Sequence, residues 1–189
     1  MAAAELALTV LKDNPNLKAY YQFSAGALTT DSSGNSHTLT NNNTIPAVAA
    51  VFGDGADIEY ASNQYFSMAD HADFNFGTGE FAIGGWFKRE STGWYGGMFA
   101  KMASGDTDGY RFVFDASNVI QFAVNNGGYS LSTVATYTDT SSFHHAVVTR
   151  VAGVVRIYVD GAMAASGSSS IDVDSTAGVY IGTYRSEAG

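Results

Sequence analysis

The stretch Phe143–Gly161 constrains the fold more than any other part of the sequence. Two runs rich in β-branched residues flank Ala152-Gly153, a pair of small residues that can reverse the chain. The second run ends in Asp160-Gly161, a strong signal for a type I′ turn. Apolar and polar side chains alternate along Val155–Val159, the pattern of a strand with one dry face. The stretch therefore predicts two consecutive hairpins, whose dry face the rest of the chain must cover with a second sheet.

The composition agrees with an all-β chain that forms one domain of ordinary size. Of the 189 residues, 46% are hydrophobic, which is enough to form a proper core. With 21 glycines, 13% aromatic residues and only two prolines, the composition favours many short strands joined by tight turns over long helices. We find no internal repeat and no linker that would mark a second domain.

The charge balance and the lack of cysteine exclude several kinds of partner and site. Nine basic and 18 acidic residues give a formal net charge of −9. Such a chain repels phosphate backbones and anionic membrane surfaces, so we expect it to bind no nucleic acid. Without cysteine it can form neither disulfides nor thiolate metal sites. Any structural ion would therefore have oxygen ligands, which calcium prefers.

The N-terminal residues resemble neither a secretory signal peptide nor a membrane anchor. Met1–Leu8 contains no basic residue and carries Glu5 within its apolar part. No apolar run in the chain is long enough to span a bilayer, so we expect no membrane insertion. Glu5–Lys12 has the spacing of a short helix. We therefore divide the chain into an N-terminal segment, residues 1–18, and a single β-sandwich domain, residues 19–189.

Short alternating runs predict roughly a dozen strands along the chain. Apolar residues occupy both faces of Glu80–Lys88, so we expect this strand to be central and buried, with Phe81 and Trp86 in the core. Strands at this spacing, with no helical pattern between them, predict two stacked antiparallel sheets. The other expected strands are Ala19–Phe23, His37–Thr40, Ala49–Phe52, Ile58–Tyr60, Tyr65–Met68, Met98–Met102, Tyr110–Phe114, Val119–Asn125, Tyr129–Val134, Met163–Ser166 and Val179–Gly182.

Three stretches, taken in order, resemble the laminin G-like or concanavalin A-like jelly-roll superfamily: Tyr65–Phe87, Gly109–Phe114 and Phe143–Gly161. In that family an aromatic strand precedes a "W-x-H-V-A" strand and an "L-Y-V-D-G" strand. Here Phe143 stands for the tryptophan of the second motif, and the third motif reads Ile157–Gly161. The resemblance implies a jelly-roll sandwich. It does not identify a ligand, because this architecture hosts lectins, adhesion modules and hydrolases alike.

The resemblance covers about Ala19–Gly182 and implies one strand more than the chain contains. Domains of this type usually close with a Gly-x-Ile-Asp-Glu-Val-like strand soon after the strand that ends here in Ile181-Gly182, yet this chain stops at Gly189. We therefore expect a fragment that lacks its closing C-terminal strand, or a strand supplied by a partner. An open sheet edge of this kind would allow self-association.

The sequence lacks the carboxylate pattern that a glycoside hydrolase of this fold would need. Such enzymes place two acids about 5–9 Å apart across the scissile bond. The nearest approach, Asp57-Ile58-Glu59, has no third acid. His144-His145 could suggest a base, but His145 alternates with apolar neighbours, which favours a hydrogen-bonded core histidine. We therefore predict that the chain is not an enzyme.

One loop has the residues of a calcium site. Asp31, Ser33 and Asn35 offer hard oxygen ligands at alternate positions around a glycine. The resemblance implies a structural calcium at this loop in some relatives, partly held by a closing aspartate that this chain lacks. A turn in which side chains bond to the backbone, without any ion, explains the same residues. Asp106 and Asp108 form a second, weaker candidate, which a solvated hairpin loop explains better.

Aromatic residues in loops are the candidates for sugar binding, because the C–H faces of sugar rings pack on aromatic rings while the hydroxyls need fixed polar partners. Trp94 and Tyr95, bracketed by glycines, are the most conspicuous pair. Tyr129 beside Asn125 and Asn126 is the second. The alternative for each is a ring that closes the end of the sandwich.

Together these features predict a non-catalytic β-sandwich module that binds carbohydrate or a cell-surface ligand. We expect it to belong to a larger extracellular or phage-particle protein, although the chain itself carries no signal peptide. The alternatives are a glycanase-like domain that acts on a β-glucan and a structural assembly module that uses its open edge.

Overall fold

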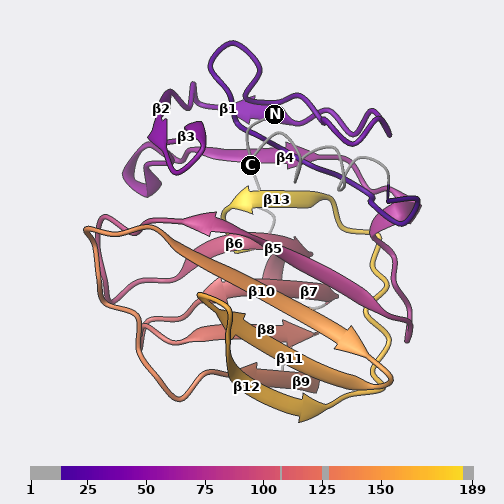
Figure 1. The fold of residues 1–189 in the computed structure, drawn as a ribbon. Coiled ribbons are helices and arrows are strands. Elements are labelled where there is room, and N and C mark those ends of the chain that lie inside the picture. Colours follow the sequence, from indigo (N-terminus) through magenta and orange to yellow (C-terminus); the bar gives the residue numbers. More distant parts are fainter. Residues whose placement is uncertain (1–13, 107, 125–127, 185–189) are drawn as a thin grey trace. The chain divides into compact units, whose positions relative to one another are not determined.

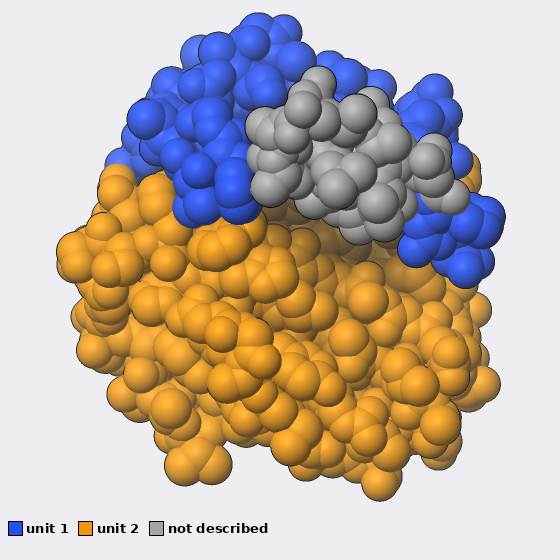
Figure 2. All heavy atoms as spheres, viewed as in Figure 1, with its two compact units in different colours: residues 1–68 blue, residues 69–189 orange. Residues whose placement is uncertain are grey.

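The computed structural model describes residues 14–106, 108–124 and 128–184 (Figure 1). The chain divides into two compact units, residues 1–68 and 69–189, which we describe separately (Figure 2). The all-β prediction is confirmed. None of the helices in the described part of the chain has the length and apolar character needed to cross a bilayer. The helix predicted at Glu5–Lys12 lies outside the described residues, and the single domain predicted for residues 19–189 stays a prediction.

Short strands and turns make up the described part of the first unit. Strand β1, Thr40–Asn42, pairs antiparallel with β4, Tyr65–Met68. Strands β2, Ala47–Ala50, and β3, Gly53–Ala56, form a small hairpin of their own. A 3-10 turn, η1, covers Tyr60–Ser62.

Two of the strands predicted in this unit are wrong, and two others are displaced: His37–Thr40 overlaps β1 only at Thr40, and the end of Ala49–Phe52 forms the turn between β2 and β3. Ala19–Phe23 contributes only a single bridge, between Tyr21 and Asp31. Ile58–Tyr60 leads into the 3-10 turn instead of forming a strand. Polar neighbours surround both segments, and neither supplies a run of alternating apolar residues long enough to fix a register.

The second unit is a two-layer antiparallel sandwich (Figure 1). One layer contains, in order, β13-β6-β7-β8-β9, and the other contains β12-β11-β10-β5. Two 3-10 turns, η2 and η3, connect strands. The elements are β5 Phe81–Phe87, β6 Gly96–Met102, β7 Gly109–Phe114, β8 Ile120–Val124, β9 Tyr129–Ser132, β10 His144–Val151, β11 Val154–Val159, β12 Ala162–Ser168, β13 Val179–Gly182, η2 Ala72–Phe74 and η3 Ser104–Asp106.

The double hairpin predicted from the sequence is confirmed. Strand β10 pairs with β11 through Ala152-Gly153, and β11 pairs with β12 through Asp160-Gly161. All four turn residues have positive φ, as a type I′ turn requires. Buried and half-buried side chains alternate along β11, so the predicted dry face is the face that packs in the core.

Aromatic and β-branched side chains from both layers fill the core. The Phe81 ring on β5 lies 5.4 Å from that of Phe122 on β8, measured between centroids, which joins the two sheets. Burial of each such ring stabilises the fold by roughly 1.5–3 kcal/mol. The buried members are Phe81, Tyr110, Phe112, Phe114, Ile120, Phe122, Val124, Ala146, Val148, Val155, Ile157, Val159 and Val173.

Strand β5 forms where it was predicted, but its predicted central, buried position is wrong. It ends the four-stranded layer and pairs on one side with β10. Phe81 faces the core, whereas Trp86 points outward with 49% of its surface exposed. The outward positions before Trp86 are Ala82 and Gly84, so only one face of the strand carries enough apolar surface to require cover.

Two buried cations join the loops of this unit to its sheets. Arg150 on β10 is 1% exposed, and its guanidinium donates to the carbonyls of Gly79, Ile171 and Gly77 at 2.7, 2.7 and 2.6 Å. It also lies over the Phe81 ring, 5.0 Å from the centroid. The contacts fix residues that lie about seventy and twenty positions away in the sequence.

Lys101 on β6 has the same role in the other sheet. Its side chain is fully buried, and its ammonium donates to the Asp70 carboxylate at 2.6 Å. Two further bonds reach the carbonyls of Ser175 and Ala177, at 2.5 and 2.8 Å. Three oxygens thus compensate for the desolvation of the ammonium.

We expect Arg150→Met to lower the free energy of unfolding by about 3 kcal/mol or more, because three buried carbonyls would lose their charged donor. Urea denaturation followed by circular dichroism measures the change. Arg156→Met on the outward face of β11 is the matched control, with an expected change within about 0.5 kcal/mol. Equal effects of the two substitutions would show that Arg150 does not anchor the loops.

Candidate functional site

Trp94 and Tyr95 lie in the loop between β5 and β6 and project into solvent. Their exposed fractions are 69% and 45%. The Tyr95 ring packs at 5.3 Å, centroid to centroid, against that of Tyr184. Pairing of β6 with β13 explains this contact, because Tyr95 precedes one strand and Tyr184 follows the other. We call Trp94, Tyr95 and Tyr184 the aromatic loop surface.

Buried polar contacts hold the loop that carries this surface. The Asn118 side-chain oxygen accepts bonds from the Gly93 amide at 2.7 Å and from the Arg89 guanidinium at 3.0 Å. Arg89 is 9% exposed, donates to the Tyr137 carbonyl at 2.9 Å and lies 4.4 Å from the Phe114 ring centroid. Burial lowers the pKa of Arg89, and the charge of Asp115 opposes that shift. The loop is therefore pre-organised at its base.

The second predicted group of sugar-binding residues has a different environment. Asn125 and Asn126 lie outside the described residues. The Tyr129 ring packs against the hydrophobic core, and its hydroxyl is buried without a hydrogen-bond partner among the described residues. Burial raises the pKa of that hydroxyl. The half-buried Tyr129 ring thus contributes to the packing of the sandwich.

The predicted calcium ligands Asp31, Ser33 and Asn35 lie together, but protein donors already occupy them. The Asp31 carboxylate accepts four bonds of 2.8–3.0 Å, from the Tyr20, Ser33 and His37 amides and from the Ser33 hydroxyl. The Asn35 amide nitrogen donates to backbone carbonyls. A carboxylate has about four lone-pair sites, so an ion would have to displace backbone donors. These residues fit a turn braced by its own backbone better than a calcium cage.

We therefore expect the loss of the Asp31 carboxylate to lower the melting temperature more than the removal of calcium does. Desolvation raises the pKa of Asp31, but its hydrogen bonds outweigh that effect and hold the pKa below its usual value. We expect Asp31→Asn to lower the melting temperature at pH 7, an effect that fades as the pH falls below about 4 and the wild-type carboxyl protonates.

Differential scanning fluorimetry with calcium, and again with a chelator, measures the effects of the substitution and of calcium on the melting temperature. We expect the melting temperature of the wild-type chain to be the same in the two conditions. A rise with calcium that Asp31→Asn abolishes would establish an ion at this loop, because a ligand that binds only the native state stabilises it.

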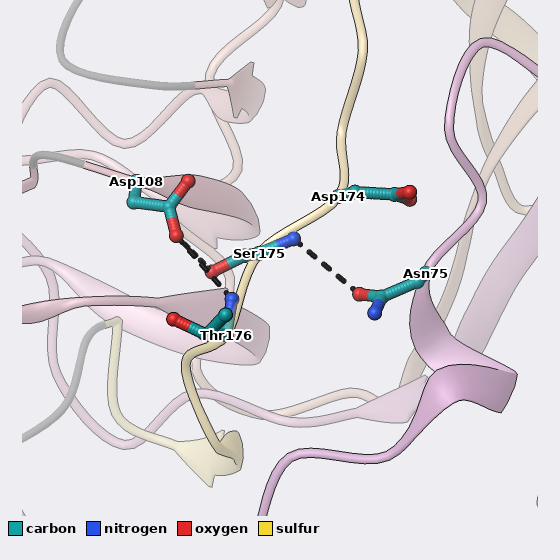
Figure 3. A pocket seen from close by; sticks show the side chains of 5 residues that line it. All are labelled: Asn75, Asp108, Asp174, Ser175 and Thr176. Carbon is teal, nitrogen blue, oxygen red and sulfur yellow. Dashed lines mark hydrogen bonds between the residues drawn. The ribbon is translucent and has the colours of Figure 1, made fainter.

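In the second candidate for an ion site, Asp108 lines a shallow depression of about 290 Å³ (Figure 3). The Asp106 side chain lies outside the described structure. The Asp108 carboxylate accepts a bond of 2.8 Å from the Ser175 hydroxyl, and Asp174 points away from it (Figure 3). Asp174 instead accepts a bond from the Gly77 amide. The polar groups of this depression brace the loop that carries Ser175.

Of the two adjacent histidines, His144 forms a cluster with the carboxylates of Asp139 and Asp160. His144 Nδ1 lies 2.7 Å from an Asp160 oxygen, and its Nε2 lies 3.4 Å from an Asp139 oxygen. The Ser141 hydroxyl donates to Asp139 at 2.6 Å instead of to the imidazole. The hydrogen bond with Asp160 raises the pKa of His144, and burial opposes it. His145 packs at 5.2 Å from the outward Trp86 ring, so it is not the core histidine that the sequence predicted.

Because its folded-state pKa is raised, His144 should stabilise the fold below about pH 6.5 and lose that contribution as the pH rises through the folded value. We expect Asp160→Asn to lower the pKa of His144, measured by NMR titration of its ring protons. Asparagine tolerates the positive φ of this turn position, so the hairpin should survive. An unchanged pKa would show that Asp160 does not interact with the ring.

A family model described as the concanavalin A-like lectin/glucanases superfamily matches residues 61–188. The chain belongs to this superfamily. The match confirms the resemblance in the sequence, and the sandwich of the second unit is the fold that it implied. No curated protein sequence matches the chain.

Three solved structures that are 12–17% identical to this chain share its fold. The binding domain of Paraclostridial Mosquitocidal Protein 1 has a TM-score of 0.68 and 15% identity, over 80% of this chain and 41% of that one. Domain 4 of AbnA, an extracellular arabinanase from Geobacillus stearothermophilus in complex with arabinotriose, has a TM-score of 0.68 and 17% identity, over 89% and 84%. The binding domain of Botulinum Neurotoxin DC in complex with SialylT has a TM-score of 0.60 and 12% identity, over 80% and 39%. This chain thus spans less than half of the two toxin chains.

Proposed function

We propose that this superfamily member is a non-catalytic module that binds carbohydrate through the aromatic loop surface. The observation that carries the proposal is the exposure of Trp94, 69%, on a loop whose base is fixed by Asn118 and Arg89. Large apolar side chains held in solvent by an ordered support are typical of binding sites. Tyr95 and Tyr184 extend the same surface and add hydroxyls that can bond to a sugar.

The solved relatives support a glycan ligand. AbnA domain 4 has the same fold and holds arabinotriose, and the neurotoxin domain is in complex with SialylT. The aromatic loop surface presents rings, which suit the C–H faces of sugars, and carries no net negative charge among its three side chains. We infer a role in attaching a larger extracellular or phage-particle protein to a glycan.

The polar clusters in the structure do not favour catalysis. Two carboxylates, Asp139 and Asp160, both contact the His144 ring. A glycosidase needs one carboxyl that keeps its proton and one that is free to attack or activate water. The hydrogen bonds of Asp139 and Asp160 lower the pKa of both groups, so neither would act as the acid near neutral pH.

We expect Trp94→Ala to weaken binding to a glycan ligand at least about tenfold, which corresponds to about 1.4 kcal/mol. A glycan array selects the ligand, and isothermal titration calorimetry measures the dissociation constant. Tyr60→Ala is the matched control, because Tyr60 is a 73% exposed aromatic residue in the first unit.

Three outcomes would contradict the proposal. Unchanged affinity of Trp94→Ala would remove the aromatic loop surface from the binding site. Release of reducing sugar from a β-glucan would indicate a glycanase. Oligomers that form with rising concentration, together with no array signal, would favour a structural assembly module.

A further inference from the structure

The outward face of the four-stranded layer is a second surface with the composition of a binding site. Side chains alternate along each strand, so the strand registers place outward residues in rows across β5, β10, β11 and β12. Trp86 lies opposite His145, and Val147 lies opposite Tyr158. In Figure 1 this layer lies in front of the five-stranded layer, and its outward face is turned to the viewer. We call it the outer sheet face.

Large apolar side chains remain exposed on the outer sheet face. Trp86 and Met163 are 49% and 59% exposed. No side chain stands beside Trp86 at the next outward position of β5, because that residue is Gly84. A Cβ at Gly84 would lie 2.7 Å from a Val147 methyl, so a larger residue cannot be placed there without moving β10. Glycine at this position therefore leaves part of the Trp86 ring exposed.

The positive charges of the second unit are distributed unequally. Arg89, Lys101 and Arg150 are buried and bonded to backbone carbonyls. Arg156 lies on the outer sheet face opposite Thr149, and Lys88 follows β5 on the same side as Trp86. The acids beside these strands, Glu80 before β5 and Asp160 after β11, accept bonds from the Ala152 and His145 amides. Lys88 and Arg156 supply the positive charge that this face offers to an anion.

Arg156 has hydrogen-bonding side chains on both sides. Among the described residues its guanidinium makes no ion pair, hydrogen bond or ring contact. The residues directly opposite it are Thr149 on β10 and Ser166 on β12, so two hydroxyls flank it. Tyr158 lies two positions further along the same face. Lys88, which lies 5.5 Å from the centroid of the Phe143 ring, stands at the other end of the rows.

We propose that the outer sheet face binds an acidic oligosaccharide, in which Arg156 pairs with a sugar carboxylate. The planar guanidinium can form two parallel hydrogen bonds to a carboxylate, and the flanking hydroxyls can bond to the neighbouring sugar hydroxyls. The rings of Trp86 and Phe143 offer faces for sugar C–H groups. Arg156 lies opposite Thr149, and Lys88 lies over Phe143, six residues earlier in the chain or about 20 Å along an extended strand, so a second carboxylate further along the sugar chain can reach Lys88.

A sugar fits this face better than an acidic peptide does. An extended peptide gains most of its affinity from main-chain hydrogen bonds at a sheet edge. The outer sheet face presents side chains only, since the backbone groups of β10 and β11 are paired with neighbouring strands on both sides. This site does not use the aromatic loop surface, so the two sites can be tested separately.

The two tryptophans supply separate reporters. In Trp94→Phe the remaining tryptophan is Trp86 on the outer sheet face, and in Trp86→Phe it is Trp94 on the loop. We expect oligogalacturonate, a carboxylated probe, to change the fluorescence of Trp94→Phe saturably. Rising sodium chloride should weaken the effect, because exposed charge pairs are screened. A neutral oligoglucan should not produce it.

We expect Arg156→Gln, made in the Trp94→Phe background, to weaken oligogalacturonate binding at least tenfold, and Arg156→Lys to restore part of it. Lys18→Gln removes one exposed cation from the first unit and is the control for net charge. Its affinity should remain within twofold of the parent. Arg156 makes no contact that the fold needs, so circular dichroism and the melting temperature should not change.

Several results would overturn the proposal. These are the absence of a saturable response to oligogalacturonate, equal losses in Arg156→Gln and Lys18→Gln, and binding of sulfated dextran in place of the carboxylated probe. A dimer that Arg156→Gln dissociates would identify a second copy of the chain as the occupant instead. If Trp94 variants bind neutral glycans normally while the outer sheet face still binds oligogalacturonate, only the proposed function of the aromatic loop surface is contradicted.

Discussion

The guanidinium of Arg150 is the interaction on which the second unit depends most. It lies inside the sandwich, where an unpaired charge would cost several kcal/mol, and it is tolerated because three backbone carbonyls surround it. Two of these carbonyls belong to the connection that leads into β5, and the third belongs to the connection after β12. One side chain therefore sets where both segments leave the sandwich. Residues in these connections need no regular secondary structure of their own, because a charged donor satisfies their backbone.

Lys101 extends the same principle to the opposite sheet. Its ammonium binds the Asp70 carboxylate and the carbonyls of Ser175 and Ala177, so the segment before η2 and the segment before β13 meet at one point of β6. In a chain without cysteine, two buried cations thus restrain loops in the way that a cross-link or a metal would. The contrast with Arg156, on the outward side of β11, shows that the alternation of a strand decides whether a basic residue supports the fold or faces outward.

The sequence was sufficient to predict the strands of the second unit and its two hairpins, because turn residues and a period of two are local signals. The bounds of β13 agree with the prediction, and the alternation along β11 placed its dry face. Long-range partners were not accessible. The inward position of Arg150 follows from its spacing to Val148, but nothing local identifies carbonyls that lie about seventy residues away. Trp86 was misplaced for a related reason: apolar residues on both faces of β5 indicate burial only when the outward ones are large, and Ala82 and Gly84 are not.

The same alternation explains why this unit can present two aromatic surfaces without losing its core. Phe81 and Phe87 complete the inward face of β5, so Trp86 can stay exposed at little cost to packing. Trp94 lies beyond the end of the same strand, on a loop whose base is held by hydrogen bonds of Arg89 and Asn118. Neither tryptophan contributes to the buried cluster that holds the sheets together. Trp86 packs against His145, and Arg89 and Asn118 hold the loop that carries Trp94, so the rings are displayed by residues outside the core. A binding module benefits from such support, since rigid rings lose little entropy when a ligand stacks on them.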